Sequence, residues 1–239
     1  HTFAGHEEAT LKGINLTIAS DSFCVLLGNN GSGKSTLLRL LTGEYMVENG
    51  TIEIDGADVT KKTRSSMVAC VNQEIPRGTV TQMTLLENMV LSLQRSRGGS
   101  FAFYAAQEQQ IAALVKGFGI GLEKYLHTPL GFLSGGQRQM VATLMALHSK
   151  PQLLLLDEHT SALDPKMQPQ LMAYTAAAVA AQKVTTLMIT HNLSDALTYG
   201  DRVIVVQQGR ITHDISGSKK KSLTLSDLQN LLYTERAGS

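Results

Sequence analysis

Several residue types are scarce in this chain of 239 residues, and each scarcity excludes a class of protein. It has no tryptophan and only two cysteines, too few for a disulfide-stapled secreted scaffold and without the spacing of a zinc site. Its 21 basic and 20 acidic side chains give a net charge of +1, so composition supplies no field that attracts bulk nucleic acid. No apolar run approaches the roughly 20 residues that span a bilayer. The composition therefore predicts one large or two small globular domains with reduced cysteines and no membrane span.

Apolar runs bounded by turn residues predict the strands of a parallel sheet. They cover residues 22–27, 67–71, 153–156 and 184–189, and helical patterns separate them along the chain. The alternation of strands and helices predicts an α/β fold whose parallel sheet is covered on both faces.

Two other segments predict antiparallel pairing. Residues 51–56 alternate polar and apolar side chains and end in Asp-Gly, which is a hairpin signal. Residues 202–206 and 210–215 lie on either side of Gln207-Gln208-Gly209, and this arrangement predicts a late hairpin.

The middle of the chain predicts a helical subdomain inserted into the α/β core. From about 76 to 150 the strand pattern gives way to helical patterns, including a helix that begins near Gly136 with an apolar stripe at Met140, Leu144 and Leu147. The predicted organisation is a core of about 1–75 and 151–215, this subdomain at about 76–150, and a tail of about 216–239.

A glycine-rich loop follows the first apolar strand and leads directly into a helix. It fits the pattern G-x-x-x-x-G-K-[ST] and, with the next residue, consists of Gly28, Asn29, Asn30, Gly31, Ser32, Gly33, Lys34, Ser35 and Thr36. Glycines let backbone N–H groups point inward at a phosphate, and the helix N-terminus adds the positive end of its dipole. Lys34 is predicted to reach the β- and γ-phosphates of a nucleotide, and Ser35 to hold Mg²⁺. The strand before the loop and the helix after it disfavour a plain glycine-rich turn.

Two carboxylates end the third apolar strand. Asp157 and Glu158 follow residues 153–156, at the carboxyl end of a strand, where ligands bind in open α/β sheets. Asp157 is predicted to hold Mg²⁺ through water, and Glu158 to act as general base on an attacking water. Without the glycine loop, simple solvation of two acidic side chains would be the better interpretation.

A second glycine-containing motif opens the helix near Gly136. It runs Leu133, Ser134, Gly135, Gly136 and Gln137, and it offers another helix N-terminus suited to phosphate. Together with the glycine loop, this pentapeptide resembles the signature motif of the ATP-binding subunits of ABC transporters. The resemblance covers nearly the whole chain and implies a P-loop NTPase fold of the RecA-like kind, with an antiparallel β region near its N-terminus and an inserted helical subdomain.

The resemblance implies roles for residues that say little singly. Gln73 resembles the Q-loop glutamine that approaches the metal and the attacking water, and His191 resembles the switch histidine that contacts the γ-phosphate. Asp164 belongs to a segment that resembles the D-loop, and Phe3 is the upstream aromatic residue that would stack on adenine. The family pairs two subunits head to tail, so that residues 134–137 and Asp164 would serve the partner's nucleotide.

The implied activity is ATP hydrolysis, with ATP and Mg²⁺ as ligands, that drives a separate transmembrane permease from the cytoplasmic side of the membrane. Expected partners are the permease subunits, a second ATP-binding subunit in a homodimer and, for an importer, an extracytoplasmic substrate-binding protein. Residues 157–160 and 216–221 resemble importers that use a tryptophan-transport-like binding protein, which indicates an amino-acid-like cargo. The alternatives are an ABC exporter or lipoprotein-release ATPase. A non-transport ABC ATPase acting on DNA or ribosomes is disfavoured, and we expect no nucleic-acid partner, because residues 73–134 carry no sustained heptads.

Some positions depart from the family or remain open. His159 stands where the family usually has proline, and it is either a tolerated turn substitution or a group that makes the activity respond to pH. Lys219–Lys221 is typical of a solvated charge run, with a lipid contact as the alternative. After it, Thr224 or Ser226 is expected to cap a short helix that carries Leu228.

Overall fold

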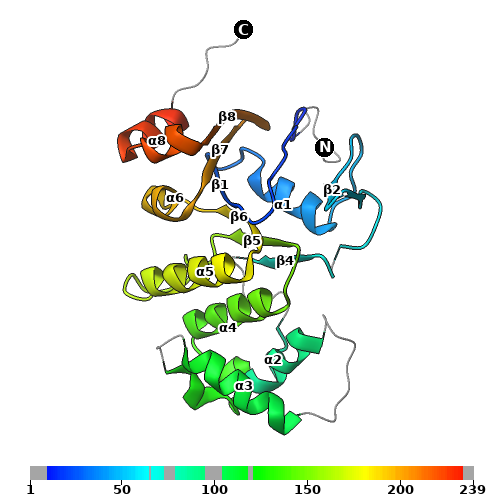
Figure 1. Ribbon diagram of the computed structural model, residues 1–239, viewed down its shortest axis with the longest axis vertical. Coiled ribbons are helices and arrows are strands. Elements are labelled where there is room, and N and C mark those ends of the chain that lie inside the picture. The colour runs from blue at the N-terminus through cyan, green and yellow to red at the C-terminus, as the bar shows by residue number, and fades with distance from the viewer. Residues whose placement is uncertain (1–9, 65, 73–78, 95–103, 118–120, 234–239) are drawn as a thin grey trace. The chain divides into compact units, whose positions relative to one another are not determined.

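The computed structural model describes residues 10–64, 66–72, 79–94, 104–117 and 121–233 (Figure 1). The chain forms two compact units. The first unit consists of His1–Val68, Gln152–Glu158 and Lys183–Ser239, and the second unit consists of Ala69–Pro151 and His159–Gln182.

A mostly parallel sheet forms the centre of the first unit. Its strands lie in the order β5 (Leu153–Asp157), β6 (Thr185–Ile189), β1 (Phe23–Leu27), β7 (Arg202–Gln207) and β8 (Arg210–Ser216). The pairs β5–β6, β6–β1 and β1–β7 are parallel, and β7–β8 is the antiparallel hairpin that the sequence predicts. Every residue of β1 is buried, which explains why it is an unbroken apolar run without alternation. The predicted α/β fold is confirmed.

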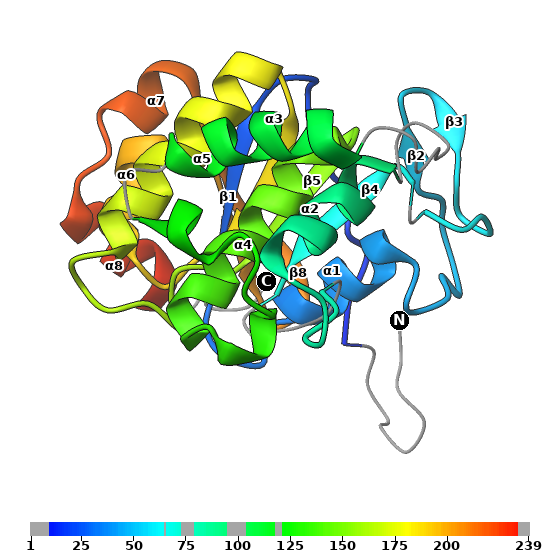
Figure 2. The same ribbon diagram turned by 90° about the horizontal axis from the view of Figure 1, so that it is seen from below.

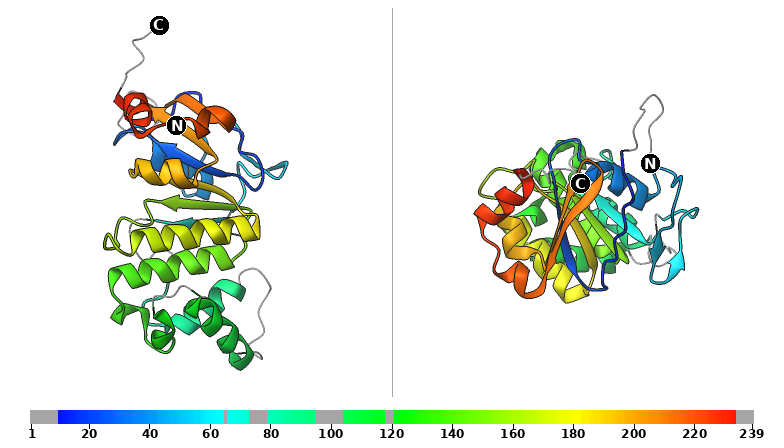
Figure 3. Two further views of the ribbon diagram at one scale, coloured as in Figure 1. Left: turned by 60° about the vertical axis from the view of Figure 1, so that its left-hand side comes forward. Right: turned by 90° about the horizontal axis from the view of Figure 1, so that it is seen from above.

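Helices cover both faces of this sheet within the first unit. Helix α1 (Lys34–Thr42) lies on one side, and α6 (Leu193–Tyr199) and α8 (Leu225–Tyr233) lie on the other, as Figure 1 and the right-hand view of Figure 3 show. A short hairpin of β2 (Glu53–Ile54) and β3 (Ala57–Asp58) pairs antiparallel, as the Asp-Gly turn predicts.

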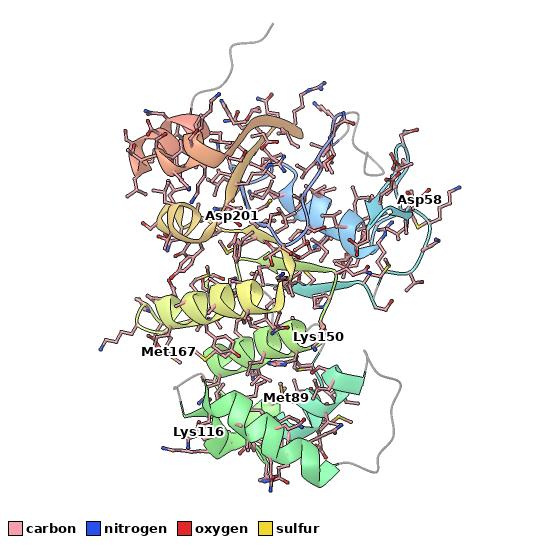
Figure 4. All side chains as sticks on the ribbon, viewed as in Figure 1. Asp58, Met89, Lys116, Lys150, Met167 and Asp201 are labelled. Carbon is pink, nitrogen blue, oxygen red and sulfur yellow. The ribbon has the colours of Figure 1, made fainter. Side chains whose placement is uncertain are left out.

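Hydrogen bonds at the strand starts align β1 with β7. The Phe23 N–H donates to the Asp201 carboxylate at 2.9 Å, and the Asp201 N–H donates to the Phe23 carbonyl at 2.8 Å (Asp201 is labelled in Figure 4). This reciprocal pair fixes the register of the two strands whose far ends carry the glycine loop and the β7–β8 turn.

A buried arginine anchors the end of α1. Arg64 is only 2% exposed and donates to the carbonyls of Val59 at 2.8 Å and Thr60 at 2.6 Å. It also donates to the carbonyl of Leu40 in the last turn of the helix, where carbonyl groups lack intrahelical partners. The cation therefore caps α1 and fixes the direction of the helix that starts at the glycine loop.

The C-terminal segment packs on the first unit. Lys220 in α7 (Gly217–Lys221) is buried and donates to the Leu197 carbonyl of α6 at 2.5 Å, so it departs from the interpretation of Lys219–Lys221 as a solvated run. Thr224 rather than Ser226 caps α8, because it exchanges hydrogen bonds with Asp227.

Helices make up most of the second unit (Figure 2). They are α2 (Leu85–Gln94), α3 (Tyr104–Lys116), α4 (Gly135–His148) and α5 (Gln168–Gln182), with short 3₁₀ turns at Leu122–Tyr125 and Leu130–Phe132, and the strand β4 (Val68–Val71) leads into the unit. The predicted stripe on α4 is confirmed, since Met140, Leu144 and Leu147 are buried. None of the helices in the described ranges combines the length and the apolar character that crossing a membrane requires.

A fully buried asparagine organises the turn that leads into α2. The Asn88 side chain accepts from the Val80 N–H at 2.7 Å and donates to the carbonyls of Val80, Met83 and Thr84 at 2.9 to 3.2 Å. All of its polar atoms are thus satisfied by backbone groups, which is the condition for burying an amide at low cost.

Replacing Asn88 by leucine tests this arrangement. Leucine keeps the volume but removes the acceptor of the Val80 N–H and one donor from each of the three carbonyls, so we expect a loss of about 2–3 kcal/mol in the free energy of unfolding, measured in urea. Gln109→Leu on the exposed face of α3 is the control and should change stability by less than about 0.5 kcal/mol. Equal stability of the two variants would contradict the role of Asn88.

Candidate functional site

The glycine loop has its shape because two positions accept only glycine. A Cβ atom at Gly28 would lie 2.2 Å from the Val206 carbonyl oxygen, and one at Gly33 would lie 2.6 Å from the Leu11 side chain. Gly33 also has φ 104°, in the left-handed region that side chains disfavour. The close approach of β7 and the sharp turn before α1 therefore both depend on these glycines.

Helix α1 starts as an anion site would require. Gly33 is its N-cap and provides no side-chain acceptor, and no side-chain cap is present among the described residues. The N–H groups of the first turn are then free of a side-chain partner, and the helix dipole adds positive potential at this end. The exposed Ser35 lies in the same turn. Backbone N–H groups, dipole and hydroxyl together fit a phosphate group.

Lys34 folds back onto the loop that precedes it. Its ammonium donates to the carbonyls of Gly28 at 2.7 Å and Asn29 at 2.9 Å, and its side chain is almost fully buried. Burial lowers the pKa of Lys34, and the nearby carboxylates of Glu158 and Asp157 oppose that shift. The loop carbonyls thus hold a cation in the position where phosphate oxygens are expected to meet it.

The two predicted carboxylates lie at the end of β5. Burial raises the pKa of Asp157, the neighbouring Glu158 raises it further, and Lys34, Arg39 and His191 act in the opposite direction. The Asp157 carboxyl group is therefore within electrostatic reach of Lys34 in the glycine loop and of His191, two residues beyond the end of β6. This is the cluster that the sequence predicts at the carboxyl edge of the sheet.

Glu158 is held from two directions. Its N–H donates to the Ile189 carbonyl of β6 at 3.0 Å, and its backbone adopts φ 49°, which is unusual for a residue with a side chain. Its Oε1 lies 2.5 Å from Nε2 of His191, and the two side chains are 19% and 53% exposed. The register of β5 on β6 pairs Asp157 with Ile189, so both strands end together and bring Glu158 beside His191. A carboxylate oriented by an imidazole can take a proton from water.

The signature residues lie in the second unit, at the start of α4. Ser134 and Gln137 form a capping box: the Gln137 N–H donates to Ser134 Oγ at 3.2 Å, and the Ser134 N–H donates to Gln137 Oε1 at 2.9 Å. A Cβ at Gly135 would meet no described atom within 4 Å, whereas one at Gly136 would contact Leu163 at 3.7 Å. The helix start therefore presents an open backbone surface at Gly135.

Asp164 has a structural role in the same unit. Its carboxylate accepts from the N–H groups of Lys166 at 2.9 Å and Met167 at 3.1 Å, and it shapes the turn that leads to α5. Such a turn fixes the course of the backbone just before α5.

The oxygen donors of Ser35 and Asp157 suit Mg²⁺ that is bound together with phosphates, rather than a metal ion that only protein side chains hold. Across the described ranges, no group of three or more His, Cys, Asp and Glu side chains gathers as a metal site. Ser35 and Asp157 supply hard oxygen donors, and Mg²⁺ is commonly bound by one or two such groups together with substrate phosphates. The two residues fit that mode of binding.

Two predicted site residues, Phe3 and Gln73, lie outside the described residues. Sequence patterns also do not predict what packs against the glycine loop: the Gly209 N–H of the β7–β8 turn, for example, donates to the Ser32 carbonyl at 3.0 Å. Gln208-Gly209 predicts a turn, but no pattern states what a turn packs against.

Comparisons with known proteins agree with this geometry. A family model described as ABC transporter matches residues 11–161. The tyrosine transport ATP-binding protein of Clostridioides difficile is 34% identical to this chain over 94% of the chain and 91% of its own length. A spermidine/putrescine import ATP-binding protein of Pasteurella multocida and a glycine betaine/proline betaine transport ATP-binding protein of Salmonella typhimurium are each 34% identical, over 87% and 84% of the chain. The chain spans about half the length of these last two, 54% and 50%.

Solved structures show the same likeness. The dimeric post-hydrolysis state of the ATP-binding cassette MJ0796 bound to ADP and Pi has a TM-score of 0.76 and 25% identity, over 90% of this chain and 94% of that one. Another dimeric structure of MJ0796, a bacterial ABC transporter cassette, has a TM-score of 0.75 and 26% identity, over 87% and 90%.

The buried His159 should make the free energy of unfolding sensitive to acid. His159 is 1% exposed, its Nε2 has no hydrogen-bond partner in the described part of the chain, and burial lowers its pKa to about 4. The unfolded chain binds a proton near its ordinary pKa of about 6.5, so the folded state loses stability as pH falls from about 6.5 toward about 4 and keeps it above that window.

Replacing His159 by leucine should remove this component. Between pH 7.5 and pH 5, the free energy of unfolding should fall by about 2 kcal/mol more in the wild type than in His159→Leu, measured in urea at both pH values. The control His127→Gln, at a histidine whose side chain is 70% exposed, should retain the wild-type acid sensitivity. The same pH dependence in wild type and His159→Leu would show that His159 does not titrate as a buried group.

Proposed function

The chain belongs to the family of ABC transporter ATP-binding subunits, and we propose that two copies form its ATP sites and drive import of an amino-acid-like solute through a separate permease. The observation that carries the proposal is the cluster in the first unit: the buried Lys34 on its glycine loop, with Asp157 and the paired Glu158 and His191 at the adjoining strand ends. This cluster combines a phosphate cradle with a general base, which is what hydrolysis of a nucleoside triphosphate requires.

The glycine loop is the proposed phosphate site. Backbone N–H groups of residues 28–36 would surround the phosphates, and Lys34 would exchange its bonds to the Gly28 and Asn29 carbonyls for bonds to phosphate oxygens. Phe3 would stack on the adenine ring.

Ser35, Asp157 and Gln73 are the residues that would hold Mg²⁺. When bound, the ion supplies charge neutralisation at the β- and γ-phosphates. Asp157 suits this position because its oxygens lie at the edge of the sheet next to the loop, and its raised pKa reflects burial that a cation would offset.

Glu158 is the proposed general base. It would take a proton from the water that attacks the γ-phosphorus, and breakage of the bond to the β-phosphate oxygen would release ADP and phosphate. His191 would orient the Glu158 carboxylate through the contact between Nε2 and Oε1. As the strand end moves with the γ-phosphate, the same contact would report the nucleotide state to the rest of the first unit.

The second half of each site would come from another copy. Ser134, Gly135, Gly136 and Gln137, together with Asp164, would face the nucleotide bound to the partner's glycine loop. Support comes from the open backbone at Gly135 and from the dimers seen for MJ0796. Closure around ATP and opening after hydrolysis would then do work on the permease.

The transport assignment rests on the relatives. The relative that the chain matches over 91% of its length is named for tyrosine transport, and the other two are named for spermidine/putrescine import and for glycine betaine transport. An amino-acid-like cargo, a permease contacted from the cytoplasmic side and an extracytoplasmic substrate-binding protein follow as the proposal.

Glu158→Gln separates binding from hydrolysis. Glutamine keeps the shape but cannot take the proton, so we expect ATP binding to persist, a closed dimer to accumulate and turnover to fall by about 10² to 10⁴. Phosphate release and gel filtration with MgATP measure these effects. Turnover at the wild-type rate would remove Glu158 from the mechanism.

The same variant tests the transport assignment. In host cells that lack the wild-type gene, the wild-type chain should restore uptake of labelled tyrosine, and Glu158→Gln should not. Restored uptake of spermidine or glycine betaine instead of tyrosine would replace the amino-acid-like cargo. Restored efflux with no uptake would replace import by export.

Mixed dimers test the shared site. A dimer of one Ser134→Arg chain and one Lys34→Ala chain retains one intact combination of loop and signature, so it should hydrolyse MgATP at that one site, measured as phosphate release. The control pairs a wild-type chain with a chain that carries both changes, and it leaves no intact combination. If each chain built its own site, the two results would be exchanged.

A further inference from the structure

The turn between β7 and β8 packs directly on the glycine loop. The Gly209 N–H donates to the Ser32 carbonyl at 3.0 Å. The Val206 carbonyl oxygen lies so close to Gly28 that a Cβ atom there would be only 2.2 Å from it. The turn is tight, because Gln208 and Gly209 have φ 47° and 78°. The end of β7 is therefore part of the support of the loop.

The C-terminal end of α8 is held by side chains from the same region. Carbonyl groups in the last turn of a helix lack intrahelical partners. The Gln207 amide donates to the carbonyls of Leu231 and Leu232, both at 3.1 Å. The Asn29 amide donates to the Leu232 carbonyl at 3.3 Å. Two side-chain amides, one from the last residue of β7 and one from the glycine loop, thus cap one helix end.

These contacts form a continuous path to Lys34. Asn29 binds α8 through its side chain and accepts from the Lys34 ammonium through its carbonyl at 2.9 Å. Helix α8 is itself fixed on the first unit by Leu228, which is fully buried, and by the Thr224 cap. A displacement of the last turn of α8 therefore acts on the residue that holds the cation of the loop.

We propose that Gln207 is a positioning residue for nucleotide binding: it fixes the end of α8, which fixes Asn29 and with it the geometry of the phosphate loop. This inference rests on the proposed function, in which the glycine loop binds ATP. Gln207 itself touches no nucleotide in this scheme. Its effect is on how well the loop is preorganised, and preorganisation changes affinity without adding contacts.

Gln207→Leu tests the proposal because leucine removes both amide donors at similar size. The Kd for MgATP should rise by about three- to tenfold, the change that loss of one or two hydrogen bonds commonly causes. The kcat should stay within about twofold, because Glu158 and His191 are untouched. Equilibrium titration with a fluorescent ATP analogue gives Kd, and steady-state phosphate release gives kcat.

Two further variants make the readout specific. Gln207→Lys restores a donor at the end of α8, where a cation also suits the helix dipole, and it should return the Kd to within about twofold of the wild type. Gln229→Leu changes an exposed glutamine in the middle of α8 and should leave Kd unchanged. If Gln207→Leu does not fold, Gln207→Glu carries the same test, since it also lacks the donors.

The outcomes separate this inference from the proposed function. Unchanged MgATP affinity in Gln207→Leu, with or without a lower melting temperature, would reduce Gln207 to a purely structural role and overturn the inference. Lys34→Ala serves as the reference: its loss of MgATP binding is expected, and normal binding by that variant would instead overturn the glycine loop as the nucleotide site.

Discussion

The site in the first unit depends on one buried cation. An ammonium group out of water needs oxygen partners, and Lys34 finds them in the carbonyls of its own loop. The path of this loop requires glycine at Gly28 and Gly33, where a Cβ atom would collide with neighbouring atoms. The neighbouring strand ends then place carboxylates near the cation and offset part of its burial. Strand register, glycine positions and charge placement are therefore parts of one electrostatic arrangement, and a phosphate ligand fits it by replacing the carbonyls as the partner of the cation.

Glu158 is likewise fixed by its neighbours. Its left-handed backbone is strained for a residue with a side chain, and such strain persists only where the surroundings impose it. Here the bond to the Ile189 carbonyl and the contact with His191 impose it, because β5 and β6 end in register. The direction of the Glu158 carboxylate is therefore determined by the ends of β5 and β6 rather than by the glycine loop. The side chain that we propose as the base is therefore oriented by the sheet, although an acidic side chain is flexible by itself.

Much of this could be predicted from local sequence, and the remainder follows contacts that local patterns do not encode. The strands, the late hairpin, the apolar stripe on α4 and the carboxylates at the end of β5 are confirmed, since each depends on side-chain period or on immediate neighbours. The burial of Lys220 could not be predicted, because its partner, the Leu197 carbonyl, is distant in sequence. The bond from Asn29 to Leu232 spans nearly the whole chain for the same reason. The roles of Phe3 and Gln73 stay predictions, as do the nucleotide contacts of the loop.

The two helix starts that the sequence assigns to phosphate differ in how their N–H groups are satisfied. At α1 the cap is a glycine with no side-chain acceptor, so an anion meets N–H groups that no side chain has to leave. At α4 the Ser134 hydroxyl already accepts from Gln137, and the Gln137 side chain accepts in return. An anion that approaches α4 therefore competes with an intact capping box, which typically stabilises a helix by about 1 kcal/mol. The first helix start is suited to hold a nucleotide within one chain. The second favours contact only when a nucleotide is already fixed opposite it, which agrees with our proposal of a partner's site that closes after ATP has bound.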